Sequence, residues 1–162
     1  MTGRAAAALV LAGALGLGAC SDDDGATAEL AGATAASPAE ARAVLQDVAG
    51  TGAGGTVGFG VAEDGDQVEV EVAVHGVPTG DVPVVLGEAA SCPPAGGSFS
   101  GERLTSVSTG PNGTASETFR TGDLSLEKGE PGYVRGRVVV VGQPGAPLAC
   151  GTVISIGRWS ES

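Results

Sequence analysis

A strict alternation of valine with acidic or small residues runs through Val68-Glu69-Val70-Glu71-Val72-Ala73-Val74. Side chains of a β-strand point alternately to its two faces, so this period of two predicts a strand with one apolar and one acidic face. Residues 57–61 alternate in the same way, and Glu63-Asp64-Gly65-Asp66 has the composition of a turn. The two segments are therefore expected to form an antiparallel hairpin.

Further segments have the length and composition of short strands, namely Val82–Leu86, Leu104–Ser108, Thr114–Arg120, Val134–Val141 and Leu148–Ile156. Pro83 predicts that the first is an edge or irregular strand, because proline has no N–H to donate to a ladder. A turn at 110–113 is expected to join the second and third into another hairpin, while 93–101 and 143–146 are expected to be loop and turn. Seven or eight short strands indicate an all-β antiparallel sandwich or barrel.

The segment before the first alternating run has two interpretations. Ser37-Pro38-Ala39-Glu40 has the pattern of a helix start, with a capping serine, a proline at the first helical position and a glutamate at the third. Residues 41–48 would then continue as a helix. They fit a strand as well, and their own composition leaves both interpretations open.

The first 20 residues have the pattern of an export signal. Arg4 supplies the positive start, and the following apolar run of about 12 to 15 residues is shorter than the roughly 20 that a membrane-spanning helix needs. Small residues precede Cys20, an arrangement that resembles the lipobox of bacterial lipoproteins. The resemblance implies that residues 1–19 are a signal peptide and that Cys20 is lipidated. The alternative is an ordinary signal peptide with Cys20 as an accidental thiol.

A lipidated Cys20 would place the mature chain outside the cytoplasm, anchored to the cell membrane, with the lipid bilayer as a partner. Residues 20–40 are polar and rich in alanine, serine and threonine, which predicts a flexible tether. Asp22, Asp23 and Asp24 within it lack the shaped loop of a calcium site, so we interpret them as part of a solvated tether.

Composition excludes several classes of function. Without Arg4 the chain has seven basic and 19 acidic residues, a net charge of −12, so nucleic acid and anionic lipid headgroups are not expected partners. No phosphate-binding loop or basic patch is present in the sequence. Glycine accounts for 29 of 162 residues and aromatic residues for 3%, which suits short strands and tight turns.

Two cysteines remain once Cys20 is assigned to the lipobox. In an oxidising compartment Cys92 and Cys150 are expected to pair. The bond would close a loop of about 58 residues, worth about 4 kcal/mol in the chain-entropy model.

The last predicted strand, Leu148-Ala149-Cys150-Gly151-Thr152-Val153-Ile154-Ser155-Ile156, resembles the terminal strand of Cu/Zn superoxide dismutases. Further pieces resemble the same family in the same order: Ala43–Leu45, Gly55–Phe59, Val74–Gly80, Leu104–Gly113 and Gly136–Val138. The resemblance implies a Greek-key β-sandwich or barrel of the Cu/Zn superoxide dismutase type over residues 41–157, with 158–162 as a tail. It also implies a strand at 41–48 and, independently of the cysteine count, a Cys92–Cys150 disulfide.

The metal-binding positions depart from the family pattern. Where the family has Gly-x-His-Gly-Phe-His-Val-His-Glu, this chain has Val82, Val85 and Gly87 in place of the histidines. Gly142 stands in the segment that carries the last copper histidine, and Pro147 replaces the active-site arginine. The zinc loop is replaced by the short segment 93–101. We therefore expect no metal cofactor and no catalytic residues.

Two other candidate sites are weaker. His75 is the only histidine, and redox copper requires several imidazole or sulfur ligands, so we interpret it as a turn residue rather than a ligand or a catalytic base. The acidic residues between Glu63 and Glu71 could hold a divalent cation weakly, but a solvated face is the simpler interpretation.

The resulting hypothesis is a membrane-anchored envelope lipoprotein whose metal-free domain is a non-catalytic binding or structural module. The alternative is a superoxide dismutase that uses an unrecognised metal site. A third interpretation is a module that loads a partner protein, dimeric through a sheet face. The sequence does not name a protein partner.

Overall fold

The structure is a computed structural model that describes residues 39–157. The predicted signal peptide, Cys20, the tether up to residue 38 and the tail 158–162 lie outside the described residues. In the described part no helix is long and apolar enough to cross a membrane.

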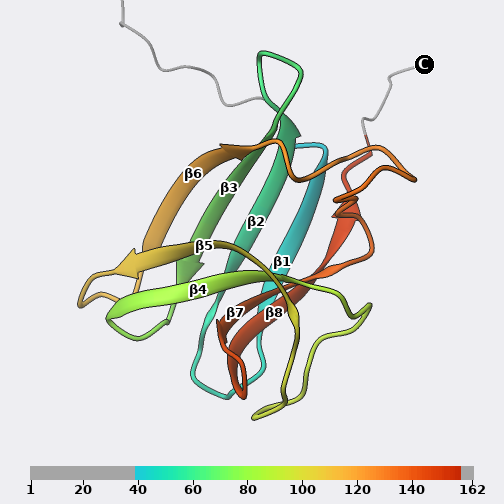
Figure 1. Cartoon of the computed structure of the whole chain (residues 1–162). Helices are drawn as coiled ribbons and strands as arrows, with labels where there is room; N and C mark the ends of the chain where they lie inside the picture. Colours follow the sequence, from blue (N-terminus) through green and yellow to red (C-terminus); the bar gives the residue numbers. More distant parts are fainter. Residues whose placement is uncertain (1–38, 158–162) are drawn as a thin grey trace, which may run out of the picture. The chain divides into compact units, whose positions relative to one another are not determined.

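Eight strands make up the domain: β1 (Ala41–Asp47), β2 (Gly54–Val61), β3 (Val68–His75), β4 (Gly80–Gly87), β5 (Gly101–Thr109), β6 (Ala115–Thr121), β7 (Val138–Gln143) and β8 (Ala146–Ser155). They form one antiparallel sheet in the order β5-β4-β7-β8-β1-β2-β3-β6. Figure 1 shows β6, β3, β2 and β1 side by side as one half of a nearly closed barrel, with β5, β4, β7 and β8 as the other half. The predicted all-β antiparallel fold is confirmed.

Residues 41–47 form a strand, so the strand interpretation of this segment is confirmed and the helical one is wrong. Alternate side chains of β1 are buried, and the strand pairs with both β2 and β8. Pairing begins one residue earlier, since the Glu40 backbone N–H donates to the Phe59 carbonyl (2.8 Å) and its carbonyl accepts from Ile156 (2.9 Å). Partners on both sides outweigh the local helix-start pattern.

The alternating valines build the barrel core. The predicted hairpin of β2 and β3 is present, with Val57 opposite Val72 and Phe59 opposite Val70. All four of these side chains are fully buried. The opposite face of β3 carries Glu69 and Glu71, so the period of two separates core from surface as predicted.

The second predicted hairpin is wrong. The 110–113 turn does connect β5 to β6, but β5 pairs with β4 and β6 pairs with β3, at opposite ends of the sheet. The connection therefore crosses from one half of the barrel to the other. The physical reason is that β3 and β4 each have one edge with unpaired backbone N–H and C=O groups, and each takes one of these strands as its hydrogen-bonded neighbour.

A seam separates β5 from β6, where the barrel would otherwise close. The Thr105 hydroxyl donates to the Glu117 carboxylate across it (3.1 Å). Beside this bridge lies a hollow of about 280 Å³ lined by Ser106, Val107, Ser108, Ala115, Ser116 and Glu117.

β4 is an interior strand whose pairing with β5 shifts register between Val84 and Val85, so of the two predicted forms it is the irregular strand and not the edge strand. Its pairing with β7 begins only at Val84, so Pro83 has a strand neighbour on the β5 side alone. The missing proline N–H thus costs no ladder bond on the β7 side. β7 begins at Val138 rather than Val134, because Val134 lies in the β6–β7 connection and hydrogen-bonds to Ser125 while its side chain enters the core.

Candidate functional site

The positions that correspond to the family's metal ligands lie on β4 and at the end of β7. Val82 is directed into the barrel, where it joins Val84 and Leu86 in the main core. Val85 and Gly87 instead line hollows outside the barrel, beneath the loop 88–100. Gly142 follows Val141, the β7 partner of Val84, so it lies beside β4, but the four positions do not share one face of the sheet because Val82 faces the barrel interior.

Two irregularities in strand pairing meet in this region. Between β4 and β5 the register steps from Val84–Thr105 to Val85–Arg103 and leaves Leu104 as an extra residue. Between β7 and β8 it steps from Val141–Ala149 to Gly142–Pro147 and leaves Leu148 as an extra residue. Because Val84 pairs with Val141, the two bulges lie at one level across four neighbouring strands. Bulges redirect side chains and are common beside functional sites.

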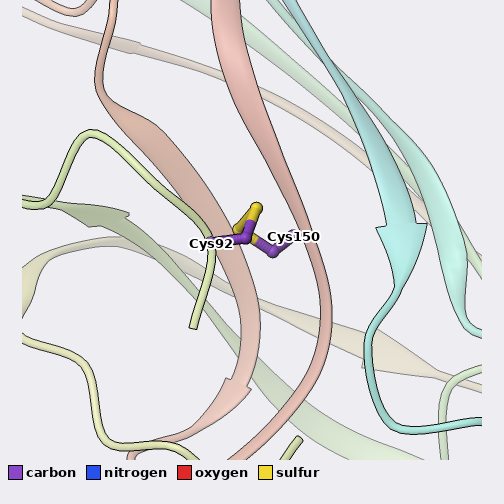
Figure 2. The surroundings of a disulfide bond; sticks show 2 residues. All are labelled: Cys92 and Cys150. Atoms are coloured by element: carbon purple, nitrogen blue, oxygen red, sulfur yellow. A yellow bond between two sulfur atoms is a disulfide. The ribbon is translucent and has the colours of Figure 1, made fainter. Parts of the chain in front are cut away.

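The loop 88–100 is attached to the barrel through a disulfide bond. Cys92 in the loop is bonded to Cys150 on β8, with the two Cα atoms 5.7 Å apart, so the predicted disulfide is present (Figure 2). Cys150 is buried with Val138 and Val140 in a second small core outside the barrel, against which Phe99 packs. The loop is thus fastened at Cys92 and again at Phe99.

Two pockets flank the Phe99–Ser100 segment. The larger, of about 500 Å³, lies between the loop and the start of β7 and includes Cys92, Pro93, Pro94 and Val138 in its walls. The smaller, of about 320 Å³, is the Arg103 pocket, lined by Pro83, Val85, Phe99, Ser100, Gly101, Arg103 and Pro144. Pro83, Val85, Phe99 and Pro144 contribute apolar side chains to its wall, Ser100 and Arg103 contribute polar ones, and Arg103 provides its charge.

Arg137 holds the end of β4 in place. Its guanidinium donates to the backbone carbonyls of Gly87 (3.1 Å) and Leu86 (3.0 Å). The β4–β7 ladder ends at the Gly87–Val138 pair, next to Arg137. The Arg137 side chain therefore adds two hydrogen bonds that hold the end of β4 where the backbone ladder stops. In the sequence, Arg137 belongs to the segment 136–138 that resembles a strand start of the family. Its two carbonyl partners lie at least 50 residues away in the chain, so the local sequence does not predict them.

Two of the four positions could not take a larger side chain without a shift of neighbouring atoms. A Cβ atom on Gly87 would lie 2.8 Å from Cγ2 of Val138. Gly142 has a φ of +128°, where side chains are strained, and a Cβ there would lie 2.6 Å from the Ala146 carbonyl oxygen. Val82 and Val85 have no atom that coordinates a metal. Among residues 39–157 no group of three or more histidine, cysteine, aspartate or glutamate side chains is placed to hold a metal ion.

The other candidate residues lie away from this region. His75 is exposed at the end of β3, opposite Gly54, and its side chain forms no recorded hydrogen bond with residues 39–157. On the acidic face, Glu69 of β3 forms an ion pair with Arg120 of β6 (3.1 Å). The charge of this carboxylate is therefore already neutralised by a neighbouring strand. Neither feature forms a catalytic arrangement.

Sequence reasoning missed Arg103 and Phe99. Phe99 lies in the segment predicted as loop, and Arg103 lies between that loop and the predicted strand 104–108; Arg103 reaches the outer surface because of the bulge at Leu104. The prolines and the phenylalanine in segment 93–101 could have indicated a loop that packs against the domain. No local sequence pattern predicts the bulge at Leu104.

Comparisons with known proteins agree on the fold. No protein-family model matches the chain, and no curated protein matches it. Among solved structures, the copper(II) form of superoxide dismutase 5 from Candida albicans superposes with a TM-score of 0.58 at 17% identity, covering 76% of this chain and 97% of that one. The clock protein EA4 superposes with a TM-score of 0.58 at 20% identity, covering 74% and 96%. The described domain therefore has the β-barrel fold of the Cu/Zn superoxide dismutase-like proteins.

Proposed function

We propose that the protein is a membrane-anchored envelope lipoprotein whose superoxide dismutase-like barrel is a non-catalytic binding module. The observation that carries the non-catalytic part is the crowding at Gly87 and Gly142, where an added Cβ atom would lie 2.8 Å from Cγ2 of Val138 and 2.6 Å from the Ala146 carbonyl oxygen. The valines at 82 and 85 supply no ligand at the other two. Anchoring rests on the lipobox-like sequence before Cys20.

Binding is favoured over a purely structural role by the surface that replaces the metal centre. The loop 88–100 is held to the barrel by a disulfide and by Phe99, yet it leaves two pockets open at the surface. A loop that served only to cover the sheet would fill this space. Pre-formed pockets that combine apolar side chains with polar groups are typical of ligand sites.

Metal analysis of the purified mature chain tests the non-catalytic proposal. The chain is exposed to copper and zinc, desalted and measured by mass spectrometry, alongside a Cu/Zn superoxide dismutase as positive control. We expect substoichiometric metal, no dismutase activity, and a melting temperature that copper, zinc and chelator leave unchanged, because metal stabilises a fold only through a site in the folded state. Stoichiometric copper with dismutase activity would establish the alternative enzyme instead.

A further inference from the structure

We propose that the Arg103 pocket binds a small apolar molecule that carries a carboxylate or sulfonate group. The inference rests on the proposed function as a binding module and assigns that module a site and a ligand class. The pocket volume of about 320 Å³ lies at the lower end of the range for small-molecule sites, roughly 300–1,000 Å³.

The bulge at Leu104 creates the site. With a regular register Arg103 would pair with Leu86, whose side chain is directed into the barrel core. The extra residue moves Arg103 opposite Val85 instead, on the outer surface. Leu104 itself packs against the core. The bulge thus keeps a leucine in the barrel and delivers a cation to the edge of an apolar pocket.

The charge of Arg103 is not used within the described part of the chain. Arg120 and Arg135 form ion pairs with Glu69 and Glu40, and Arg137 binds two carbonyls. Arg103 forms no ion pair and no side-chain hydrogen bond with residues 39–157. The Arg103 guanidinium can therefore pair with the anionic group of a ligand, and the carboxylate of Glu88 already accepts a hydrogen bond from the pocket residue Ser100 (3.2 Å).

The walls of the pocket select for an apolar body. Pro83 and Val85 from β4, Phe99 from the loop and Pro144 from the β7–β8 turn present carbon surface from three separate segments. The second bulge precedes this turn, so Pro144 is also placed by an irregular register. A neutral apolar molecule would be stabilised only by the burial of its apolar surface. An anionic one would be stabilised by the same burial and also by a charge-assisted hydrogen bond from the Arg103 guanidinium.

Fluorescence titration with 8-anilinonaphthalene-1-sulfonate, an aromatic anion, tests the proposal, with neutral N-phenyl-1-naphthylamine for comparison. The mature Cys20→Ala chain, exported so that its disulfide forms, needs no detergent. We expect Arg103→Gln to weaken binding of the anion about three- to tenfold and to leave the neutral dye unchanged. Val85→Phe, which fills the pocket, should abolish binding of both dyes.

Two controls separate this site from other surfaces. Arg42 on β1 is also exposed and has no recorded partner among residues 39–157, so Arg42→Gln should leave binding of both dyes unaffected. Val44 and Ile154 are exposed apolar residues on the outer face of β1 and β8, and Val44→Thr with Ile154→Thr should also have no effect. The proposal is overturned if wild type binds neither dye, if Arg103→Gln binds the anion normally, or if the β1–β8 substitutions remove the signal. A melting curve for each variant shows whether it is folded. If Val85→Phe does not fold, the comparison of Arg103→Gln with wild type tests the proposal alone, because Arg103 is exposed and its substitution should not disturb the fold.

Discussion

Asp47 shows how one side chain holds a connection between strands. Its carboxylate accepts backbone N–H bonds from Ala49 (2.9 Å), Gly50 (2.8 Å) and Gly52, all in the β1–β2 connection. The Gly52 bond is the main cause that holds the pKa of Asp47 below its ordinary value of 3.8; desolvation, the second cause, acts in the opposite direction, and the remaining backbone N–H groups lower the pKa further. The charged form of Asp47 is therefore the one that organises the turn.

Asp47→Asn should lower the melting temperature at pH 7. A carboxyl whose pKa is depressed by folding stabilises the fold above its ordinary pKa, and this contribution is lost as the pH falls through the lower folded pKa. The difference between variant and wild type should therefore shrink as the pH falls below 3.8. Thermal unfolding followed by circular dichroism between pH 7 and pH 3 measures it.

Asp64→Asn is the matched control for this experiment. Asp64 is exposed in the β2–β3 turn, and no hydrogen bond of its side chain is recorded within residues 39–157. Its substitution should leave the melting temperature unchanged at every pH. An Asp47→Asn variant as stable as wild type at pH 7, or a difference independent of pH, would contradict the assigned role.

The exposure of Arg103 is a property that its own position in the sequence does not determine. Its type and position are visible in the sequence, but its surface exposure depends on one extra residue in the β4–β5 register. The same holds for Gly142, whose positive φ follows the second bulge. A register shift is decided by packing of both strands against the core, so a single strand's pattern does not contain it.

At the scale of elements, local pairing was predictable and distant pairing was not. The β2–β3 hairpin needs only two alternating runs and a turn between them. The partners of β5 and β6 instead depend on which exposed strand edges β3 and β4 offer, and the resemblance to the family's hairpin did not reveal it. The choice of strand for residues 41–47 came from the family resemblance, because only distant partners overrule a helix-like local pattern.

The disulfide is the element-level feature with the largest predicted effect on stability. Replacing both Cys92 and Cys150 by alanine should lower the free energy of unfolding by about 4 kcal/mol, since 58 residues separate them and the unfolded chain gains the freedom of that loop. Urea unfolding with and without reductant measures this loss. Cys150 is buried, so part of the effect will come from the lost sulfur atom.

Reduction of the wild type gives the control for this effect. Reduced wild-type protein should approach the double variant in stability, while the variant itself should not respond to reductant. Equal stability of oxidised and reduced wild type would show that Phe99 and the small outer core hold the loop 88–100 without help from the bond.

At the scale of the whole molecule, anchoring is a prediction from the N-terminal sequence. Cys20→Ala should move the protein from washed membranes to the soluble extracytoplasmic fraction, because the change removes the acyl attachment site. Immunoblots of fractionated cells measure the distribution. Ser21→Ala is the neighbouring control and should remain in the membrane fraction. A processed Cys20→Ala protein retained in washed membranes would contradict lipid anchoring.

The seam between β5 and β6 determines where this barrel opens with the least loss of hydrogen bonds. Every other pair of neighbouring strands shares a backbone ladder, whereas one recorded side-chain bridge, from Thr105 to Glu117, spans this gap in the described domain. Amide hydrogens on the facing edges of β5 and β6 should accordingly exchange with solvent ahead of those in β1 or β8. Widening of the gap would uncover two strand edges at once, each a template for a strand of another molecule, and the Glu117 charge between them opposes such intermolecular pairing.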